Sequence, residues 1–228
     1  MKRNGLRALA LASCVVALFS VLSMAVDLEG IVANELIEEI SNAAGLNLVD
    51  TYIADYTVEE LTDLAANGYT PGVKLAADRA LFKINGGLLP LIEMTDEELL
   101  ALAAAGDQDA ADAYVFNARS DLKQPAVIEA AIAEATDETL IRAYGKLLGG
   151  FYGPGSILGM KTEAELLVLV EGEDLGLQVA AATALTTYWI LNSDLTIPQV
   201  EAKILDVTLW KPELAAAYQG FLTYLYSL

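Results

Sequence analysis

The sequence predicts an all-α protein, folded as an α-solenoid of stacked antiparallel helix pairs. Three observations support this fold class. A nine-residue phrase that is typical of a helix start recurs along the chain, and Ala-rich segments follow most of its copies. Of the 228 residues, 55% are hydrophobic and only one is Cys, so an apolar core rather than disulfides must hold the fold together.

The first 25 residues have the layout of a secretory signal peptide. Three basic residues within the first seven positions precede an apolar run over 8–24, and small residues allow cleavage after Ala25. We therefore expect a secreted, periplasmic or cell-envelope protein. Two alternatives stay open: the run is nearly long enough to remain as an N-terminal membrane anchor, and "LASC", ending at Cys14, resembles a lipoprotein box.

The chain is strongly acidic, with a formal net charge of −19. Residues 1–25 carry three basic and no acidic side chains, so their removal would bring the charge to −22. Such a chain repels phosphate backbones and anionic lipid surfaces, so we expect no nucleic-acid partner, no binding to anionic membranes and no membrane insertion after cleavage. The partner that this charge favours is a protein, and a cationic one, with self-association as a further possibility.

The composition argues against most site chemistry. The chain has no His, and its one Cys lies in the signal segment, so we expect no cofactor and no zinc, copper or haem site. A serine hydrolase would lack its usual base. Paired carboxylates are plentiful, so a carboxylate-based hydrolase stays as the third and least favoured interpretation. The acidic runs at 107–112 and 171–174 do not match a calcium loop, although the sequence leaves calcium binding open.

The recurring phrase reads "TVEELTDLA" at 57–65, "TDEELLALA" at 95–103 and "TEAELLVLV" at 162–170. In each copy, Thr is followed three residues later by Glu, which is the capping box of a helix start. Looser copies stand at 136–144 and 196–204. Apolar residues recur four, seven and eight positions after the Thr, so these helices should bury the same stripe.

Ala-rich segments that follow the phrase predict the second helix of each pair. The small residues would let neighbouring helices approach closely, and the phrases start 26 to 41 residues apart, a spacing typical of stacked helix pairs. The expected second helices are 71–84, 108–122, 175–191 and 212–228.

Two of these segments, "VKLAADRAL" (73–81) and "LQVAAATAL" (177–185), resemble the second helix of HEAT-type repeats, especially the short bacterial variety. The resemblance covers residues 57–122 and 162–228. It departs from the family in lacking the usual Pro in the first helix and most of the Asp/Arg ladder, of which Asp78-Arg79 is the only trace. It implies a scaffold or binding surface, and no catalytic residue travels with it.

The predicted domain organisation is a signal peptide (1–25) followed by a single helical repeat domain (26–228). Within it, the helices of 26–56 should cap one end of the stack, and 57–228 should hold the repeats. The stretch 149–161, "GGFYGPGSILGMK", contains five Gly and is expected to be an irregular loop. Its likeness to a phosphate loop fails because Met160 separates Gly159 from Lys161-Thr162.

No catalytic, cofactor or metal residue is predicted. The Gly-rich loop is a candidate partner-binding element because its large side chains should be exposed. The acidic first turns of the capped helices should line one edge of a regular stack and attract a cationic partner. The candidate binding residues are Phe151, Tyr152, Ser156, Ile157, Glu59, Glu60, Asp96, Glu97 and Glu163.

The function that these observations favour is that of an exported, non-catalytic scaffold or adaptor at the cell envelope. The alternative is a structural envelope protein that assembles with itself through the apolar end faces of the stack. The third reading is the carboxylate-based hydrolase.

Overall fold

The computed structural model describes residues 30–68 and 70–228, and in this part of the chain every regular element is a helix. The all-α prediction is therefore confirmed, whereas the predicted signal segment lies outside the described residues. None of the described helices has the length and apolar character needed to cross a bilayer. The helices are α2 (Gly30–Leu46), α3 (Val49–Asp55), α4 (Val58–Asn67), α5 (Pro71–Ile84), α6 (Leu89–Ile92), α7 (Asp96–Ala104), α8 (Gln108–Ala118), α9 (Pro125–Glu134), α10 (Glu138–Tyr152), α11 (Glu163–Val170), α12 (Leu175–Asn192), α13 (Ile197–Val207) and α14 (Pro212–Ser227).

The recurring phrase starts a helix at each of its copies. Helices α4, α7, α11 and α13 begin directly after Thr57, Thr95, Thr162 and Thr196, and each start is closed by a capping box. The copy at 136–144 starts one residue later than predicted, because the side chain of Asp137 accepts the free backbone N–H groups at the start of α10.

The apolar stripe of these helices is buried as predicted. The residue four positions after the capping Thr has no exposed surface in α4, α7, α11 and α13; these residues are Leu61, Leu99, Leu166 and Val200. One sequence pattern therefore fixes both the start of each helix and the face that it buries.

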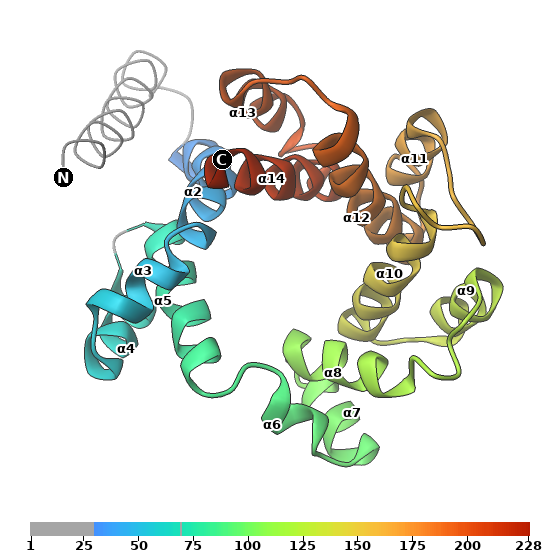
Figure 1. The fold of residues 1–228 in the computed structure, drawn as a ribbon, viewed down its shortest axis with the longest axis horizontal. Helices are drawn as coiled ribbons and strands as arrows, with labels where there is room; N and C mark the ends of the chain where they lie inside the picture. Colours follow the sequence, from blue (N-terminus) through green and yellow to red (C-terminus); the bar gives the residue numbers. More distant parts are fainter. Residues whose placement is uncertain (1–29, 69) are drawn as a thin grey trace.

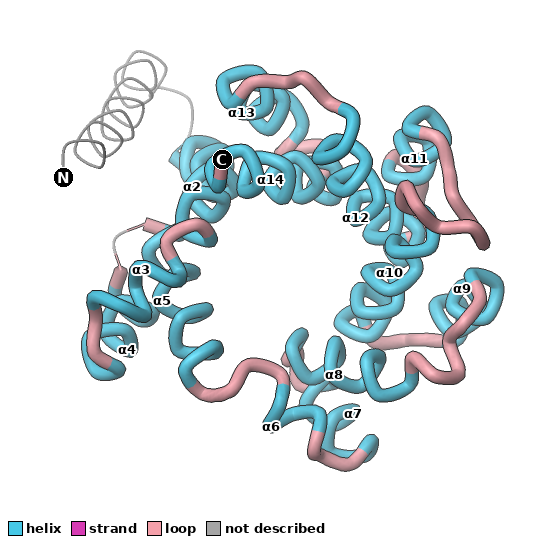
Figure 2. Tube along the Cα trace, viewed as in Figure 1, coloured by secondary structure: helices cyan, strands magenta, loops and turns pink. Residues whose placement is uncertain are grey.

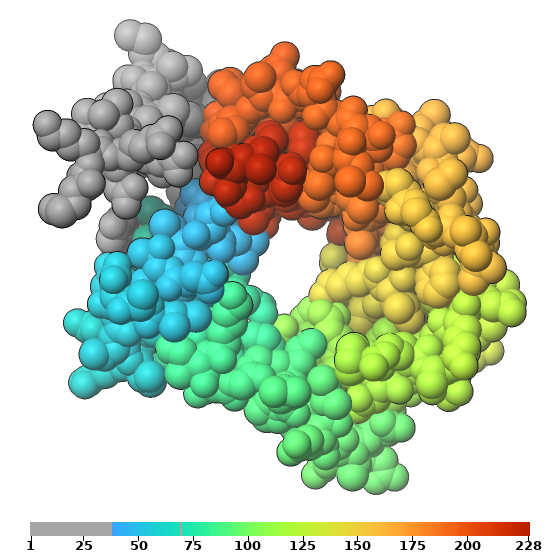
Figure 3. Space-filling view, in the orientation of Figure 1, coloured from blue at the N-terminus to red at the C-terminus, as the bar shows by residue number. Residues whose placement is uncertain are grey.

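The helix pairs are arranged in a ring around a central opening (Figure 1). Helices α2, α5, α8, α10, α12 and α14 line the inside, and α4, α7, α9, α11 and α13 lie outside them. Sequential neighbours pack together, as α4 does with α5, α11 with α12 and α13 with α14. The space-filling view shows that the opening persists when side chains are drawn (Figure 3).

The ring is closed by contact between its first and last helices. Helix α2 packs against both α14 and α13. The side-chain amide of Asn47 donates to the backbone carbonyl oxygen of Thr223 (2.7 Å), and the hydroxyl of Thr208 donates to Glu39. The helices of 26–56 therefore do not form the free terminal cap expected from the sequence. They have a packed neighbour on each side.

Ion pairs link inner helices to one another, although Asp78-Arg79 was the one hint of such a ladder in the sequence. Arg79 of α5 pairs with Asp109 of α8 (3.0 Å), and Lys146 of α10 pairs with Asp112 of α8 (2.6 Å). Arg142 of α10 reaches Glu213 at the start of α14 (2.8 Å). The partners are about one repeat apart or further along the chain, so short sequence windows do not reveal them.

The close approach of α10 and α12 depends on glycine. A Cβ atom at Gly149 would lie 2.7 Å from the carbonyl oxygen of Ala180, and one at Gly145 would lie 2.7 Å from that of Gly176. This contact explains why the loop predicted over 149–161 begins late: α10 continues to Tyr152, and only 153–161 is irregular. Gly149 serves helix packing, and neither it nor Gly150 breaks the helix.

Candidate functional site

The predicted acidic residues occupy the first turns of α4, α7 and α11. Glu59, Glu60, Asp96 and Glu97 are exposed, and Glu60 also closes a capping box, whereas Glu163 is half-buried. Negative side chains in a first turn are stabilised by the partial positive charge at a helix N-terminus. The structure thus places these acids on three different helices, each at the same point of its helix.

The capping hydrogen bonds hold the Glu side chains in their charged form. In α4, Glu60 Oε2 accepts the backbone N–H of Thr57 and the Thr57 hydroxyl, both at 2.8 Å. These hydrogen bonds, the backbone one foremost, lower the pKa of Glu60 below its usual value, and the equivalent bonds lower the pKa values of Glu98 and Glu165. The first turns therefore carry firmly ionised carboxylates.

Two of the four residues expected in the exposed Gly-rich loop lie elsewhere. Tyr152 is only 4% exposed, and its hydroxyl donates to Glu129 Oε1 (2.7 Å). Phe151 is half-buried against the main core. Both belong to the last turn of α10, so the prediction that their rings are exposed for binding is wrong. Burial, with the contribution of Glu129, raises the pKa of Tyr152 well above its usual value.

The remaining loop, 153–161, does present apolar side chains to solvent. Ile157 is 96% exposed, Leu158 58% and Met160 64%. The hydroxyl of Ser156 accepts the backbone N–H of Leu158 (3.3 Å), which shapes the turn. The backbone N–H of Lys161 donates to the carbonyl oxygen of Tyr152 (3.0 Å), so the two ends of the loop are held together.

We expect the acidic first turns and this apolar loop to lie on one face of the ring. Short connections join antiparallel helices. A connection that leaves the end of an inner helix therefore reaches the start of the next outer helix on the same side of the ring. Figure 2 shows the α10–α11 and α12–α13 connections on the side turned toward the viewer. We call this side, at which α4, α7, α11 and α13 begin, the capping-box face. The exposed Leu191, at the end of α12, belongs to it as well.

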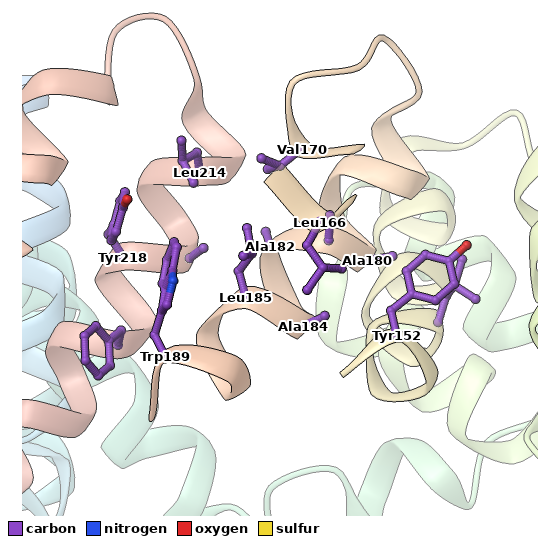
Figure 4. Packing of buried hydrophobic residues seen from close by; sticks show 14 of the residues in the cluster. Tyr152, Leu166, Val170, Ala180, Ala182, Ala184, Leu185, Trp189, Leu214 and Tyr218 are labelled. Carbon is purple, nitrogen blue, oxygen red and sulfur yellow. The ribbon is translucent and has the colours of Figure 1, made fainter. Parts of the chain in front are cut away.

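A cleft of about 520 Å³ opens between α11 and α13. Its floor contains Trp189 of α12 and Tyr218 of α14, whose rings stack at 4.3 Å with an interplanar angle of 4° (Figure 4). The indole N–H of Trp189 donates to Glu163 Oε1 (2.6 Å), so this predicted residue forms one wall. The α12–α13 connection and α13 form the opposite wall.

The walls of the cleft carry charges of both signs beside the aromatic floor. Asp194 and Glu163 supply carboxylates, and the Nζ atom of Lys203 lies 5.6 Å from the centre of the Tyr218 ring. Burial, followed by the nearby charge of Glu163, raises the pKa of Tyr218, so its hydroxyl keeps its proton. The arrangement suits hydrogen bonding and cation binding.

Sequence reasoning missed most of this cleft. Asp194, Lys203 and Trp189 carried no pattern of their own, because they come from two helices and a connection that only the fold brings together. One signal was present: four tyrosines, including Tyr188 and Tyr218 of the cleft, gather in the last forty or so residues. Lys203 also stands where the apolar stripe of the phrase predicts a buried residue.

The acidic run at 107–112 has structural partners. Asp107 caps α8, Asp109 pairs with Arg79, and Asp112 pairs with Lys146 and accepts the side-chain amide of Gln108. Among the described residues, no three acidic side chains gather closely enough to hold a metal ion. The ion-pair ladder accounts for these acids.

A second cleft, of about 570 Å³, lies between α2 and α5. Its walls include Glu38, Asn42, Lys74 and Asp78, and none of its described lining residues is aromatic. It also adjoins residue 69, which lies outside the described part of the chain. The α11–α13 cleft is therefore the better-defined candidate.

These features define a ring of helix pairs in which acidic first turns, exposed apolar side chains and an aromatic cleft lie near the starts of outer helices. No family model matches the chain, and neither a curated protein nor a solved structure matches it. The function must therefore be argued from the described residues themselves.

Proposed function

We propose that this chain is an exported, non-catalytic protein of stacked HEAT-like helix pairs, serving as a protein-binding scaffold or adaptor at the cell envelope. The single observation that supports this proposal most is the composition of the capping-box face. That face combines ionised carboxylates at the starts of several helices with apolar side chains as exposed as Ile157. Exposed apolar groups beside unpaired charge are typical of a surface that binds another protein.

The net charge defines the kind of partner. A chain of −19 repels a second acidic protein or an anionic surface, and it attracts a basic protein over a distance of about one Debye length. The expected partner is therefore a basic protein with apolar side chains. Association should slow and weaken as salt is added, because electrostatic steering sets the rate of encounter.

The test is affinity capture from the protein's own cell envelope, at low and high ionic strength, followed by mass spectrometry. The triple variant E59Q/D96N/E97Q neutralises three exposed acids of the capping-box face. The matched control, E134Q/E173Q/D206N, neutralises three exposed acids near the opposite ends of the outer helices. We expect a basic protein whose capture is lost with salt and with the first variant and is retained with the control. Capture that ignores ionic strength, or two variants with equal effects, would contradict the proposal.

Self-assembly through apolar end faces is the alternative that the ring argues against. Its first and last helices pack on each other, so those surfaces are already covered within one chain. Size-exclusion chromatography with light scattering separates the two readings. The adaptor predicts a monomer at every concentration, whereas large regular oligomers would favour a structural envelope protein.

A further inference from the structure

The α11–α13 cleft contains a polar group with no partner. Tyr218 is 8% exposed and lines the cleft, yet its hydroxyl has no hydrogen-bond partner among the described residues. The ring is buried, but the hydroxyl oxygen itself reaches solvent, since Glu39 Oε2 is the buried side-chain polar atom left without a partner among the described residues. The hydroxyl is thus available to a group that enters the cleft from outside.

The two carboxylates of the cleft also have unused capacity. Glu163 Oε1 accepts the indole N–H of Trp189, and the other carboxylate oxygen accepts no hydrogen bond within the described part of the chain. Asp194 is exposed, and neither carboxylate has a Lys or Arg nitrogen within ion-pair distance among the described residues. An acidic, aromatic-floored cleft without a paired cation favours a positively charged guest.

The free protein places one of its own cations in this cleft. Lys203 holds its ammonium group 5.6 Å from the centre of the Tyr218 ring, and it makes no ion pair with the described carboxylates. Its side chain is flexible and half-exposed, so it can swing toward solvent at small cost. Its position shows that an ammonium group fits against this floor.

We propose that the cleft binds a lysine or arginine side chain of a basic partner protein, which displaces Lys203 from Tyr218. The guest cation lies over the Tyr218 ring and donates charge-assisted hydrogen bonds to the carboxylates of Glu163 and Asp194. The inference rests on the proposed function, since it makes this cleft the specific pocket of the capping-box face. The apolar loop that carries Ile157 leads directly into α11, so it lies next to the wall of the cleft that Glu163 forms.

Because Lys203 is positively charged, the direction in which its substitution changes the binding affinity tests the proposal. A cationic guest competes with Lys203, so its removal should strengthen binding. An anionic or neutral guest would instead use the ammonium group as a donor, and its removal should weaken binding.

The experiment measures binding of a terminally blocked hexalysine peptide to the full chain, kept in solution with a neutral detergent at low ionic strength. The chain has two Trp residues, so the Trp210→Phe background reports the fluorescence of Trp189 alone. Lys203→Met should tighten binding about fivefold, and Glu163→Gln and Asp194→Asn should each weaken it about fivefold to tenfold. Lys123→Met and Glu173→Gln, which change the same charges at exposed positions outside the cleft, should change binding less than twofold.

Weaker binding by Lys203→Met would overturn the proposal and indicate an anionic or neutral ligand. Equal affinities for Glu163→Gln, Asp194→Asn and Glu173→Gln would also overturn it. If E59Q/D96N/E97Q still weakened binding in that case, the proposed function would stand without this pocket. If hexalysine failed to bind at all, both would fall. Thermal melts monitored by circular dichroism check that each variant is folded, and Asp194→Asn, in an exposed connection, keeps the test valid if Glu163→Gln unfolds.

Discussion

At the scale of single residues, two adjacent glycines of α10 have opposite roles. Gly149 lies against α12, where a Cβ atom would come within 2.6 Å of the Thr183 side chain and 2.7 Å of the Ala180 carbonyl oxygen. Gly150 has nothing within 4 Å of the same position. The first is required by packing, whereas the second leaves the helix with an avoidable entropic cost.

We expect Gly149→Ala to lower the free energy of unfolding by about 1–3 kcal/mol, because backbone and a packed side chain must move to admit the methyl group. Gly150→Ala, one residue along, should raise it by about 0.5–1 kcal/mol through helix propensity. Urea denaturation measures both. A neutral Gly149→Ala would show that α10 and α12 do not approach as closely as described, and a destabilising Gly150→Ala would contradict the open space assigned to Gly150.

The tyrosines show where residue-level prediction from sequence stops. A Gly-rich stretch indicates a loop, and aromatic residues within it are then expected to be exposed. Tyr152 is buried because the glycines around it allow helix contact and let α10 continue to that residue. The same residue type in the same stretch would be exposed in a true loop, so the outcome depends on the position of α12, which local sequence does not encode.

At the scale of helices, the capping box predicts a pH dependence of stability. The pKa of Glu98 is lowered from its usual 4.5, first by the backbone hydrogen bond from Thr95 and then by its hydroxyl. A carboxyl whose pKa is lower in the folded state stabilises the protein above its unfolded-state pKa, and this contribution is lost as the pH falls through the folded value.

The variant Glu98→Gln tests this effect. Its amide can make the same reciprocal contact, as Gln199 does in α13 through a 2.9 Å bond from the Thr196 N–H, but without a charge to titrate. We expect the variant to be less stable than the parent at neutral pH, and the two stabilities to converge as the pH falls from the usual carboxyl pKa through the lowered pKa of Glu98. Urea midpoints across that range give the answer, with Glu97→Gln as the neighbouring control. A difference that stayed constant with pH would contradict the assigned role of Glu98.

Helix starts were the most predictable elements of this fold. The capping Thr and its reciprocal acid act within four residues, so a short window contains the whole mechanism, and the buried stripe follows from the same register. The ion-pair ladder was not predictable in this way. Arg79 and Asp109 are 30 residues apart, and Arg142 and Glu213 are 71 apart. The cleft depends on the same long-range placement.

At the scale of the whole molecule, the main finding beyond the sequence is closure of the ring. The sequence of each helix pair predicts that another pair packs beside it. The curvature that brings α2 to α14, however, accumulates over all the contacts between successive pairs. Small differences in packing, such as the glycine contact between α10 and α12, add up around the ring. Sequence periodicity indicates stacking and contains no measure of curvature, so an open stack with a terminal cap was the natural expectation.

Closure also determines which surfaces remain for binding. With α2 packed on α13 and α14, the broad apolar ends of a stack are covered. The capping-box face is then the surface that we propose for a partner. The proposed function and the cleft at α11–α13 both assume this geometry. An open stack would expose two apolar ends and favour self-association instead.

The distance between spin labels on α2 and α14 tests closure most directly. Labels are attached to Leu48→Cys, just after α2, and Ser227→Cys, at the end of α14, in a Cys14→Ser background; both labelled positions are exposed. Asn47 and Thr223, one and four residues away from these sites, are in contact, so a closed ring predicts a label separation of about 20 Å or less by double electron–electron resonance. An open stack of six helix pairs spaced 8–10 Å apart would separate the labels by about 50 Å, and that result would contradict the ring.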